Sequence, residues 1–185
     1  MDAGTYQLGP AAGRVTIRTG RAGLAARAGH DLLIEVTRWS VCVVVDASIS
    51  VTAELDFGSL VVREGTGGAR PLTASDRADI EKTMSKILGA PAGSATFTST
   101  RVIPSGTGGA GGAIEGTVTY RERTQPLRLQ VMTPEPGRYR GSATVAQTAF
   151  GITPYTGFFG ALKLRDEVTV EFDVDLARAE RPSKD

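Results

Sequence analysis

The chain has 185 residues and a formal net charge of +1, with 41% hydrophobic and 22% charged residues. This composition is typical of a globular domain with a sizeable core, and the near-zero net charge gives no electrostatic sign of a nucleic-acid or acidic-membrane partner. Cys42 is the only cysteine, which excludes an intramolecular disulfide.

The N-terminal segment, MDAGTYQLGPAAGRV, holds no basic stretch followed by an apolar run. A secretory signal needs both features, so we expect the protein as written to stay in the cytoplasm.

The next part of the chain combines a short helical pattern with a strand pattern. The segment RAGLAARAGH (21–30) predicts a short helix that ends at Gly29. In the following DLLIEVTRWSVCVVVD (31–46), the apolar residues change phase near Arg38. This phase slip predicts either a β-bulge or the end of one strand and the start of the next, and both devices help a sheet to bend round on itself.

Most of the remaining chain alternates apolar and polar residues with period two. Such alternation marks strands that are buried on one face only, which is typical of antiparallel sheets. The pattern runs through residues 50–62, 94–103, 112–123, 126–132, 138–147 and 165–176. The glycine-rich stretch 105–113 is expected to be a flexible connection between two of these strands.

Only residues 75–88 change clearly to a helical period. The apolar stripe of this helix consists of Ile80, Met84, Ile87 and Leu88. Thr73 or Ser75 can cap its start, and Gly89 can close its end.

These elements amount to about eight or nine strands and one main helix, without the strand–helix alternation that builds parallel sheets. A sandwich and a closed barrel both satisfy strands with one apolar face. We favour a mainly β, antiparallel β-barrel of about eight strands, because closure removes exposed strand edges. We expect a single barrel domain over residues 1–177 and a polar C-terminal tail at 178–185.

Side chains suited to catalysis or metal binding are scarce. His30 is the only histidine, so with Cys42 no zinc site of the usual Cys/His kind can form. We expect His30 to pack or to interact with the last carbonyls of the short helix before it, and a catalytic base here is the weaker alternative. Asp173 and Asp175 share the polar face of a strand, which favours a solvated surface over a metal site. The sequence therefore predicts no catalytic residue, no metal and no cofactor.

The order and spacing of several segments resemble those of the YceI-like family, the polyisoprenoid-binding proteins with a lipocalin-like barrel. These segments are GTYQL (4–8), ELDFGSLVV (54–62), ATFTSTRV (95–102), IEGTVTYRERTQPLRLQV (114–131), TAFGITPY (148–155) and LRDEVTVEFDV (164–174). The stretch AGHDLLIEVTRW (28–39) is similar to a cytoplasmic branch of the family. The chain departs from the family at Glu122, where a hairpin glycine is usual, and in showing no signal peptide.

The resemblance implies an extended barrel with a helix near one end and an elongated apolar cavity. It implies a non-enzymatic binding or carrier protein for an isoprenoid-type lipid, such as a polyprenyl chain or a quinone tail. The inward residues expected to form the cavity are Val51, Leu55, Phe97, Val118, Leu129, Tyr139, Val145 and Phe172. Polar contacts to a head group are assigned to His30 or Arg27.

The segment TAFGITPYTGFFGALKL (148–164) belongs to an uncharged run between Arg140 and Lys163. Its glycines and polar residues exclude a transmembrane helix. Its aromatic residues are Phe150, Tyr155, Phe158 and Phe159. Within the resemblance these rings line or close the cavity; the alternative is that they plug the barrel end and bind nothing.

A rival function from a different class remains. The barrel could have a solid core and act through its surface as a protein-interaction or stress-response module, without a lipid. The sequence does not distinguish a monomer from a homodimer.

Overall fold

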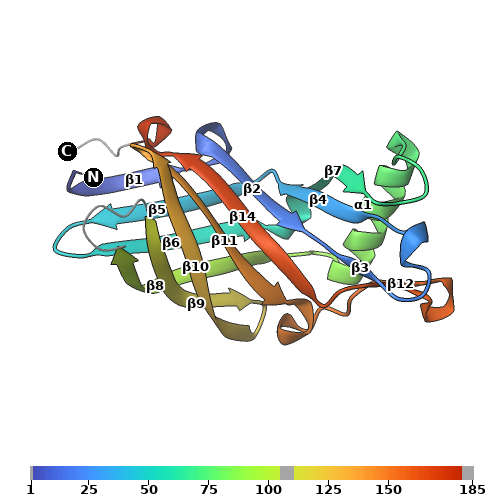
Figure 1. Cartoon of the computed structure of the whole chain (residues 1–185). Helices are drawn as coiled ribbons and strands as arrows, with labels where there is room; N and C mark the ends of the chain where they lie inside the picture. Colours follow the sequence, from blue (N-terminus) through green and yellow to red (C-terminus); the bar gives the residue numbers. More distant parts are fainter. Residues whose placement is uncertain (1, 105–110, 181–185) are drawn as a thin grey trace.

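Eleven antiparallel strands form one sheet that curls into an elongated barrel, with one α-helix at one end (Figure 1). The computed structural model describes residues 2–104 and 111–180, and the element counts refer to these residues. The strand order is β1-β5-β6-β8-β9-β10-β11-β14-β2-β4-β7. This architecture confirms the predicted lipocalin-like antiparallel barrel with one main helix.

The strands of the large sheet are β1 (Gly4–Leu8), β2 (Gly13–Arg18), β4 (Asp31–Val36), β5 (Trp39–Val45), β6 (Ile49–Asp56), β7 (Leu60–Thr66), β8 (Ser94–Pro104), β9 (Gly111–Tyr120), β10 (Arg123–Glu135), β11 (Arg138–Ala146) and β14 (Glu167–Asp175). A small sheet, in the order β12-β13-β3, consists of β3 (Arg21–Ala22), β12 (Thr156–Gly157) and β13 (Leu162–Leu164). The helix is α1 (Ala74–Leu88), and six 3-10 turns are η1 (Pro10–Ala12), η2 (Ala26–Ala28), η3 (Phe57–Ser59), η4 (Gln147–Phe150), η5 (Phe158–Gly160) and η6 (Leu176–Arg178).

Three pairs of strands are the two halves of one bent strand. The turn η1 separates β1 from β2, residues 37–38 separate β4 from β5, and η3 separates β6 from β7. Counting each pair once leaves eight long strands among the described residues, the number expected for a barrel of this kind. The interruptions explain why the sheet contains more strands than the sequence pattern predicts.

The bent first strand closes the ring. Its β1 half pairs with β5, whereas its β2 half pairs with both β4 and β14. Beyond β14, Glu180 exchanges two backbone hydrogen bonds of 2.8 and 2.9 Å with Gln7 in β1. The chain that follows the last strand is therefore joined to the first, although the sequence predicts a polar tail over 178–185; residues 181–185 of that tail lie outside the described residues.

The phase slip near Arg38 marks the end of one strand and the start of the next, one of the two predicted alternatives. The bend is held by Ser59, the one buried polar side chain among the described residues, which accepts the N–H of Arg38 at 2.9 Å. The Thr37 hydroxyl donates to the Ser59 carbonyl at 2.8 Å. Because η3 contains Ser59, two neighbouring long strands bend at the same level.

The helix α1 begins one residue earlier than predicted and carries the expected caps. The Thr73 hydroxyl and the Asp76 carboxylate form a reciprocal capping box, and Gly89 ends the helix with φ of 73°. Ile80 and Met84 pack against a buried cluster of Leu32, Ile34 and Val62 on β4 and β7. On the same side Glu81 accepts a hydrogen bond from the Val62 backbone N–H at 2.8 Å, so α1 covers a strand edge as well as an apolar face.

Two sequence predictions require correction. Residues 21–30 form β3 and a single 3-10 turn, η2, because β3 pairs with β13 and leaves too few residues for an α-helix before Gly29. Of the loop predicted over 105–113, residues 111–113 belong to β9, where they pair with β10 and β8 in spite of their glycines. Residues 105–110 lie outside the described residues.

We predict that Ile34→Ala lowers the free energy of unfolding by about 2–5 kcal/mol, because Ile34 is 4% exposed and its loss leaves a cavity beneath α1. Val44→Ala is the control, because Val44 lies on β5 and is 37% exposed. Urea denaturation monitored by circular dichroism measures both. Equal losses would contradict the assignment of Ile34 to the core.

Acid should weaken the helix cap in a defined direction. The Arg70 guanidinium, bound to Asp76 at 2.7 and 2.9 Å, holds the pKa of that carboxyl far below its ordinary range, and Thr73 adds to the effect. A lowered pKa in the folded state means that the contribution of Asp76 is complete above its unfolded value of about 4 and is lost as the pH falls further. The stability difference between wild type and Asp76→Asn should therefore be constant from neutral pH to about pH 5 and shrink below about pH 4. Denaturation curves across this range measure it, and a difference that grows towards low pH would contradict the ion pair.

Candidate functional site

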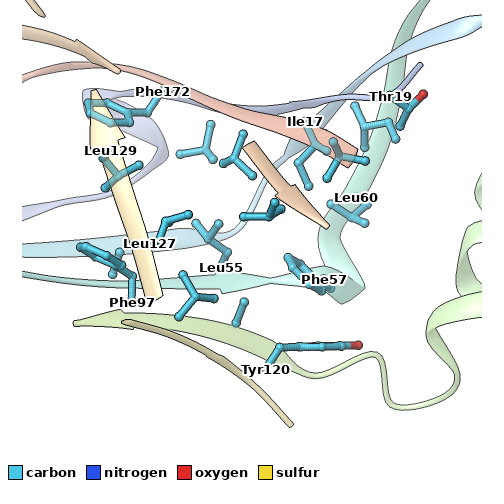
Figure 2. A pocket seen from close by; sticks show the side chains of 18 of the residues that line it. Ile17, Thr19, Leu55, Phe57, Leu60, Phe97, Tyr120, Leu127, Leu129 and Phe172 are labelled. Atoms are coloured by element: carbon cyan, nitrogen blue, oxygen red, sulfur yellow. The ribbon is translucent and has the colours of Figure 1, made fainter. Parts of the chain in front are cut away.

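The barrel encloses a cavity of about 870 Å³ that follows its long axis. The inner faces of all eight long strands contribute to the wall, and α1 contributes Ile80, Met84, Ile87 and Leu88. Figure 2 shows Leu55, Leu127 and Leu129 pointing into this space, with Phe97 and Phe172 at one end of the view and Phe57 and Tyr120 towards the other. A volume of this size is typical of a small-molecule site.

The wall is apolar because inward positions alternate with polar outward positions along each strand. On β10, Leu127, Leu129 and Val131 line the cavity, whereas Arg128 and Gln130 are exposed on the outer face. The three inward side chains are only half-buried, although they lie on the inner face of the sheet and not on its solvent face. Their remaining exposed area therefore faces the lumen, which shows that the barrel is hollow.

Two glycines keep large rings against the wall. A Cβ added at Gly116 would lie 2.7 Å from the ring of Phe97, and one added at Gly141 would lie 2.4 Å from the ring of Phe172. Gly141 and Phe172 are direct partners on β11 and β14. Each ring therefore occupies the space that a glycine leaves on a neighbouring strand. A side chain at either glycine would push the ring into the lumen and narrow it.

Ten of the twelve side chains predicted from the sequence lie on the cavity wall. They are Val51, Leu55, Phe97, Val118, Leu129, Tyr139, Val145, Phe150, Tyr155 and Phe172. They come from β6, β8, β9, β10, β11 and β14 and from the segment between β11 and β12. The strand positions were accessible to sequence reasoning because period two already separates the two faces of a strand.

Phe158 and Phe159 do not line the cavity, and their assignment to its wall is a correction. Phe158 is 65% exposed and Phe159 is 113% exposed, whereas Phe150 in the same aromatic segment is 8% exposed. The turn η5 carries both residues with positive φ, 48° and 54°, which directs the chain away from the barrel. The aromatic segment therefore divides into an inner part at Phe150 and an outer part at η5.

Sequence reasoning did not name several wall residues, among them Phe57 and Tyr120, although Phe57 continues the apolar phase of Leu55 and Tyr120 that of Val118. Phe57 stands in η3, and Tyr120 ends β9. Their ring centroids are 5.0 Å apart, and the Tyr120 hydroxyl donates to the Ala92 carbonyl at 2.6 Å. This pair closes the wall near the end of α1, where the Arg121 guanidinium lies 5.0 Å from the Tyr120 ring and donates to the Leu88 carbonyl.

Charged side chains reach the cavity only near its helix end. Of the described lining residues, those that carry a formal charge or an imidazole are Arg21, His30 and Asp79. Arg21 is engaged, because it donates to the carbonyls of Gly29 and Gly67 and lies 3.7 Å from an Asp31 carboxylate oxygen.

The two residues assigned to a head group differ in position. His30 Nε2 lies 2.7 Å from the Arg70 carbonyl oxygen and not against the carbonyls of η2. A Cβ added at Gly68 would overlap the His30 ring, so this loop packs directly on the imidazole. His30 contributes to the cavity wall, whereas Arg27 is exposed and does not.

The small sheet borders the same end of the cavity. Leu162 and Leu164 of β13 line it, as do Tyr155 just before β12 and Ala28 in η2. Tyr155 and Ala28 are also exposed to solvent, so the cavity meets the protein surface beside the small sheet.

The described residues offer no alternative site with metal-binding chemistry, since no group of three or more His, Cys, Asp or Glu side chains gathers there. Asp173 on the outer face of β14 is occupied by Arg138 and Arg140 at 2.8 and 2.9 Å, and Arg138 holds the pKa of its carboxyl below the ordinary range. In residues 2–104 and 111–180, no helix is long and apolar enough to cross a membrane.

Comparisons with known proteins agree with this architecture. A family model described as YceI-like domain matches residues 6–176. The crystal structure of BcnA from Burkholderia cenocepacia is similar, with a TM-score of 0.60 and 16% sequence identity over 88% of this chain and 94% of that chain. At this identity the likeness establishes the fold alone. A comparison with curated protein sequences gives no match.

The two parts of the aromatic segment should respond differently to truncation. We predict that Phe150→Ala lowers the free energy of unfolding by about 3–5 kcal/mol, because Phe150 is buried against Ala95 and Tyr120. Phe158→Ala should change it by less than about 0.5 kcal/mol, because that ring is mostly in solvent. Urea denaturation of both variants measures the contrast, and similar losses would mean that η5 packs on the barrel in solution.

Proposed function

Because this chain belongs to the YceI-like domain family, we propose that its barrel is a non-catalytic binding site for one isoprenoid-type lipid, such as a polyprenyl chain or a quinone tail. The observation that carries this proposal is the hollow interior of about 870 Å³, lined along the strands by aliphatic and aromatic side chains. Of the twelve site residues expected from the sequence, we keep the ten that lie on the cavity wall and omit Phe158 and Phe159.

An elongated apolar cavity favours a chain-like ligand. Each methylene group moved from water into such a lumen contributes about 0.8 kcal/mol, so a ligand of several isoprene units binds without any charged contact. Among the described lining residues, the only charged or imidazole side chains are Arg21, His30 and Asp79 near the helix end, so the hydrocarbon would lie along the rest of the wall, between Phe97 and Phe57. The rival function, a solid-core interaction module, does not account for a cavity of this size.

The helix end of the cavity favours a neutral head group. Arg21 already binds two carbonyls and Asp31, so it offers little to a phosphate, and the Asp79 carboxylate would repel one. Thr83 and the Nδ1 atom of His30 remain as hydrogen-bonding groups on the wall, since His30 Nε2 already contacts the Arg70 carbonyl. A quinone or alcohol head group suits this end better than a diphosphate, and His30, not Arg27, is the residue proposed to contact it.

The test is a titration of the purified protein with a fluorescent prenyl alcohol. We predict that Leu129→Trp weakens binding at least about tenfold, because the indole would occupy the lumen between Phe97 and Phe172. Gln130→Trp is the matched control, because Gln130 is the next residue on β10 and faces outward. It should bind as wild type does.

The same titration distinguishes the proposal from its rival. No saturable binding by wild type, or equal binding by both tryptophan variants, would overturn the cavity as the site. Thermal unfolding of Leu129→Trp without ligand shows whether the variant is folded, and Val118→Phe repeats the test from β9 if it is not. Lipid extracted from protein purified from cells would identify the natural ligand.

A further inference from the structure

Three large apolar side chains stand in solvent at the small-sheet end of the barrel. Phe159 is 113% exposed, Leu24 is 101% exposed and Phe158 is 65% exposed, and these are the highest values for large hydrophobic residues in the described chain. We call these three residues the apolar tip. Scattered apolar residues are ordinary on a protein surface, but the three most exposed ones in a single place indicate an interaction site.

Two loops that are distant in sequence come together to form the apolar tip. Leu24 follows β3, and Phe158 and Phe159 lie between β12 and β13, which pairs with β3. The Ala25 N–H donates to the Ala161 carbonyl at 2.9 Å, so the loops are joined directly beside the three side chains. Figure 1 shows both loops projecting together beyond the barrel wall, beside β12.

The backbone presents the two phenylalanines outward at a conformational cost. Both have φ in the left-handed region, 48° and 54°, which bulky residues seldom adopt. A sequence that keeps two phenylalanines in such a turn, exposed to water, is better explained by a partner that covers them than by the needs of the isolated fold.

Basic residues predominate around the apolar tip. Residues 17–30 and 148–165, which build the small sheet and its loops, contain five Lys or Arg residues and no Asp or Glu. Two acidic residues border these segments and are engaged there: Asp31 lies 3.7 Å from Arg21, and Asp166 accepts hydrogen bonds from Thr148. Arg27, Lys163 and Arg165 are exposed, and none of them forms an ion pair within the part of the chain that the structure describes. Apolar side chains ringed by free cations complement the surface of an anionic lipid bilayer.

We propose that the apolar tip docks on an anionic phospholipid bilayer, with Leu24, Phe158 and Phe159 entering the interface and the basic residues lying at the head groups. The cavity meets the surface at the same end, where Tyr155 and Ala28 both line it and are exposed to solvent. Docking would therefore place the cavity opening against the bilayer interior, from which an apolar ligand could enter. This consequence rests on the proposed function, whereas docking itself does not.

A second copy of the chain suits the apolar tip less well. A stable protein interface buries about 1,200–2,000 Å² in total, whereas three side chains of this kind supply only a few hundred. Like charges on two basic tips would also repel each other. A bilayer needs no such matched area, because a few inserted side chains and several cations act together.

The test is co-sedimentation of the full chain with vesicles of phosphatidylcholine mixed with phosphatidylglycerol, without prenyl lipid. Phe159→Asp should lower the partition coefficient at least about tenfold, because it replaces an inserted ring by a charge that the lipid repels. The matched control is Met132→Asp, because Met132 is 61% exposed on β10, outside the apolar tip. It should bind as wild type does. Lys163→Gln should weaken binding to these vesicles and leave any binding to pure phosphatidylcholine unchanged.

Equal partitioning of Phe159→Asp and Met132→Asp, or no vesicle binding by wild type, overturns the proposal. Analytical ultracentrifugation tests the alternative partner. A wild-type dimer that Phe159→Asp converts to a monomer, with no vesicle binding, would assign the apolar tip to a second copy.

A titration with prenyl alcohol in the absence of vesicles distinguishes membrane docking from ligand binding in the cavity. Phe159→Asp should bind the alcohol as wild type does, and Leu129→Trp should still bind vesicles. Vesicle binding without uptake of the alcohol would contradict the cavity function alone, and uptake without vesicle binding would contradict docking alone.

Discussion

Closure of the sheet is the constraint on which the rest of this structure depends. The ring closes where the β2 half of the first long strand pairs with β14 as well as with β4, and Gly13 begins β2 opposite Val174. A Cβ added there would lie 2.1 Å from the Asp173 backbone carbonyl oxygen, so no other residue fits without moving the strands apart. Closure removes the exposed edges of the large sheet, and it also determines how much space its inner face encloses.

The space inside follows from the same geometry. Eight long strands form a ring slightly too wide to be filled by the aliphatic side chains that face inward, and Gly116 and Gly141 let the largest rings lie flat on the wall. Part of the dense core lies outside the lumen. Tyr6, Val36 and Trp39 belong to one buried cluster, which includes the residues on either side of the β4–β5 bend, and near the helix end α1 covers Leu32 and Ile34.

The two ends also differ in charge and exposure. The helix end combines His30 and Asp79 on the cavity wall with a basic small sheet whose apolar residues stand in water. A cavity opening and a membrane-docking surface at the same end of the barrel would be complementary. An apolar ligand passes most easily between bilayer and cavity when water is excluded along the whole path. The net charge of +1 conceals this asymmetry, since the acidic residues are concentrated elsewhere in the chain.

Local patterns in the sequence determined the strands, the helix over residues 75–88 with its Thr73 cap, and the inward set on each strand, because periodicity separates the faces of a regular element whatever surrounds it. Of the twelve residues predicted for the cavity wall, ten lie on it. The local patterns could not show that the barrel is hollow, since that depends on the sum of eight strand geometries and not on any one of them. Nor could they show that Phe150 is buried whereas Phe158 and Phe159 are exposed. Outside regular elements no period relates a residue to a face, and the backbone dihedrals of η5, which only the paired small sheet holds in place, decided that the last two rings face the solvent.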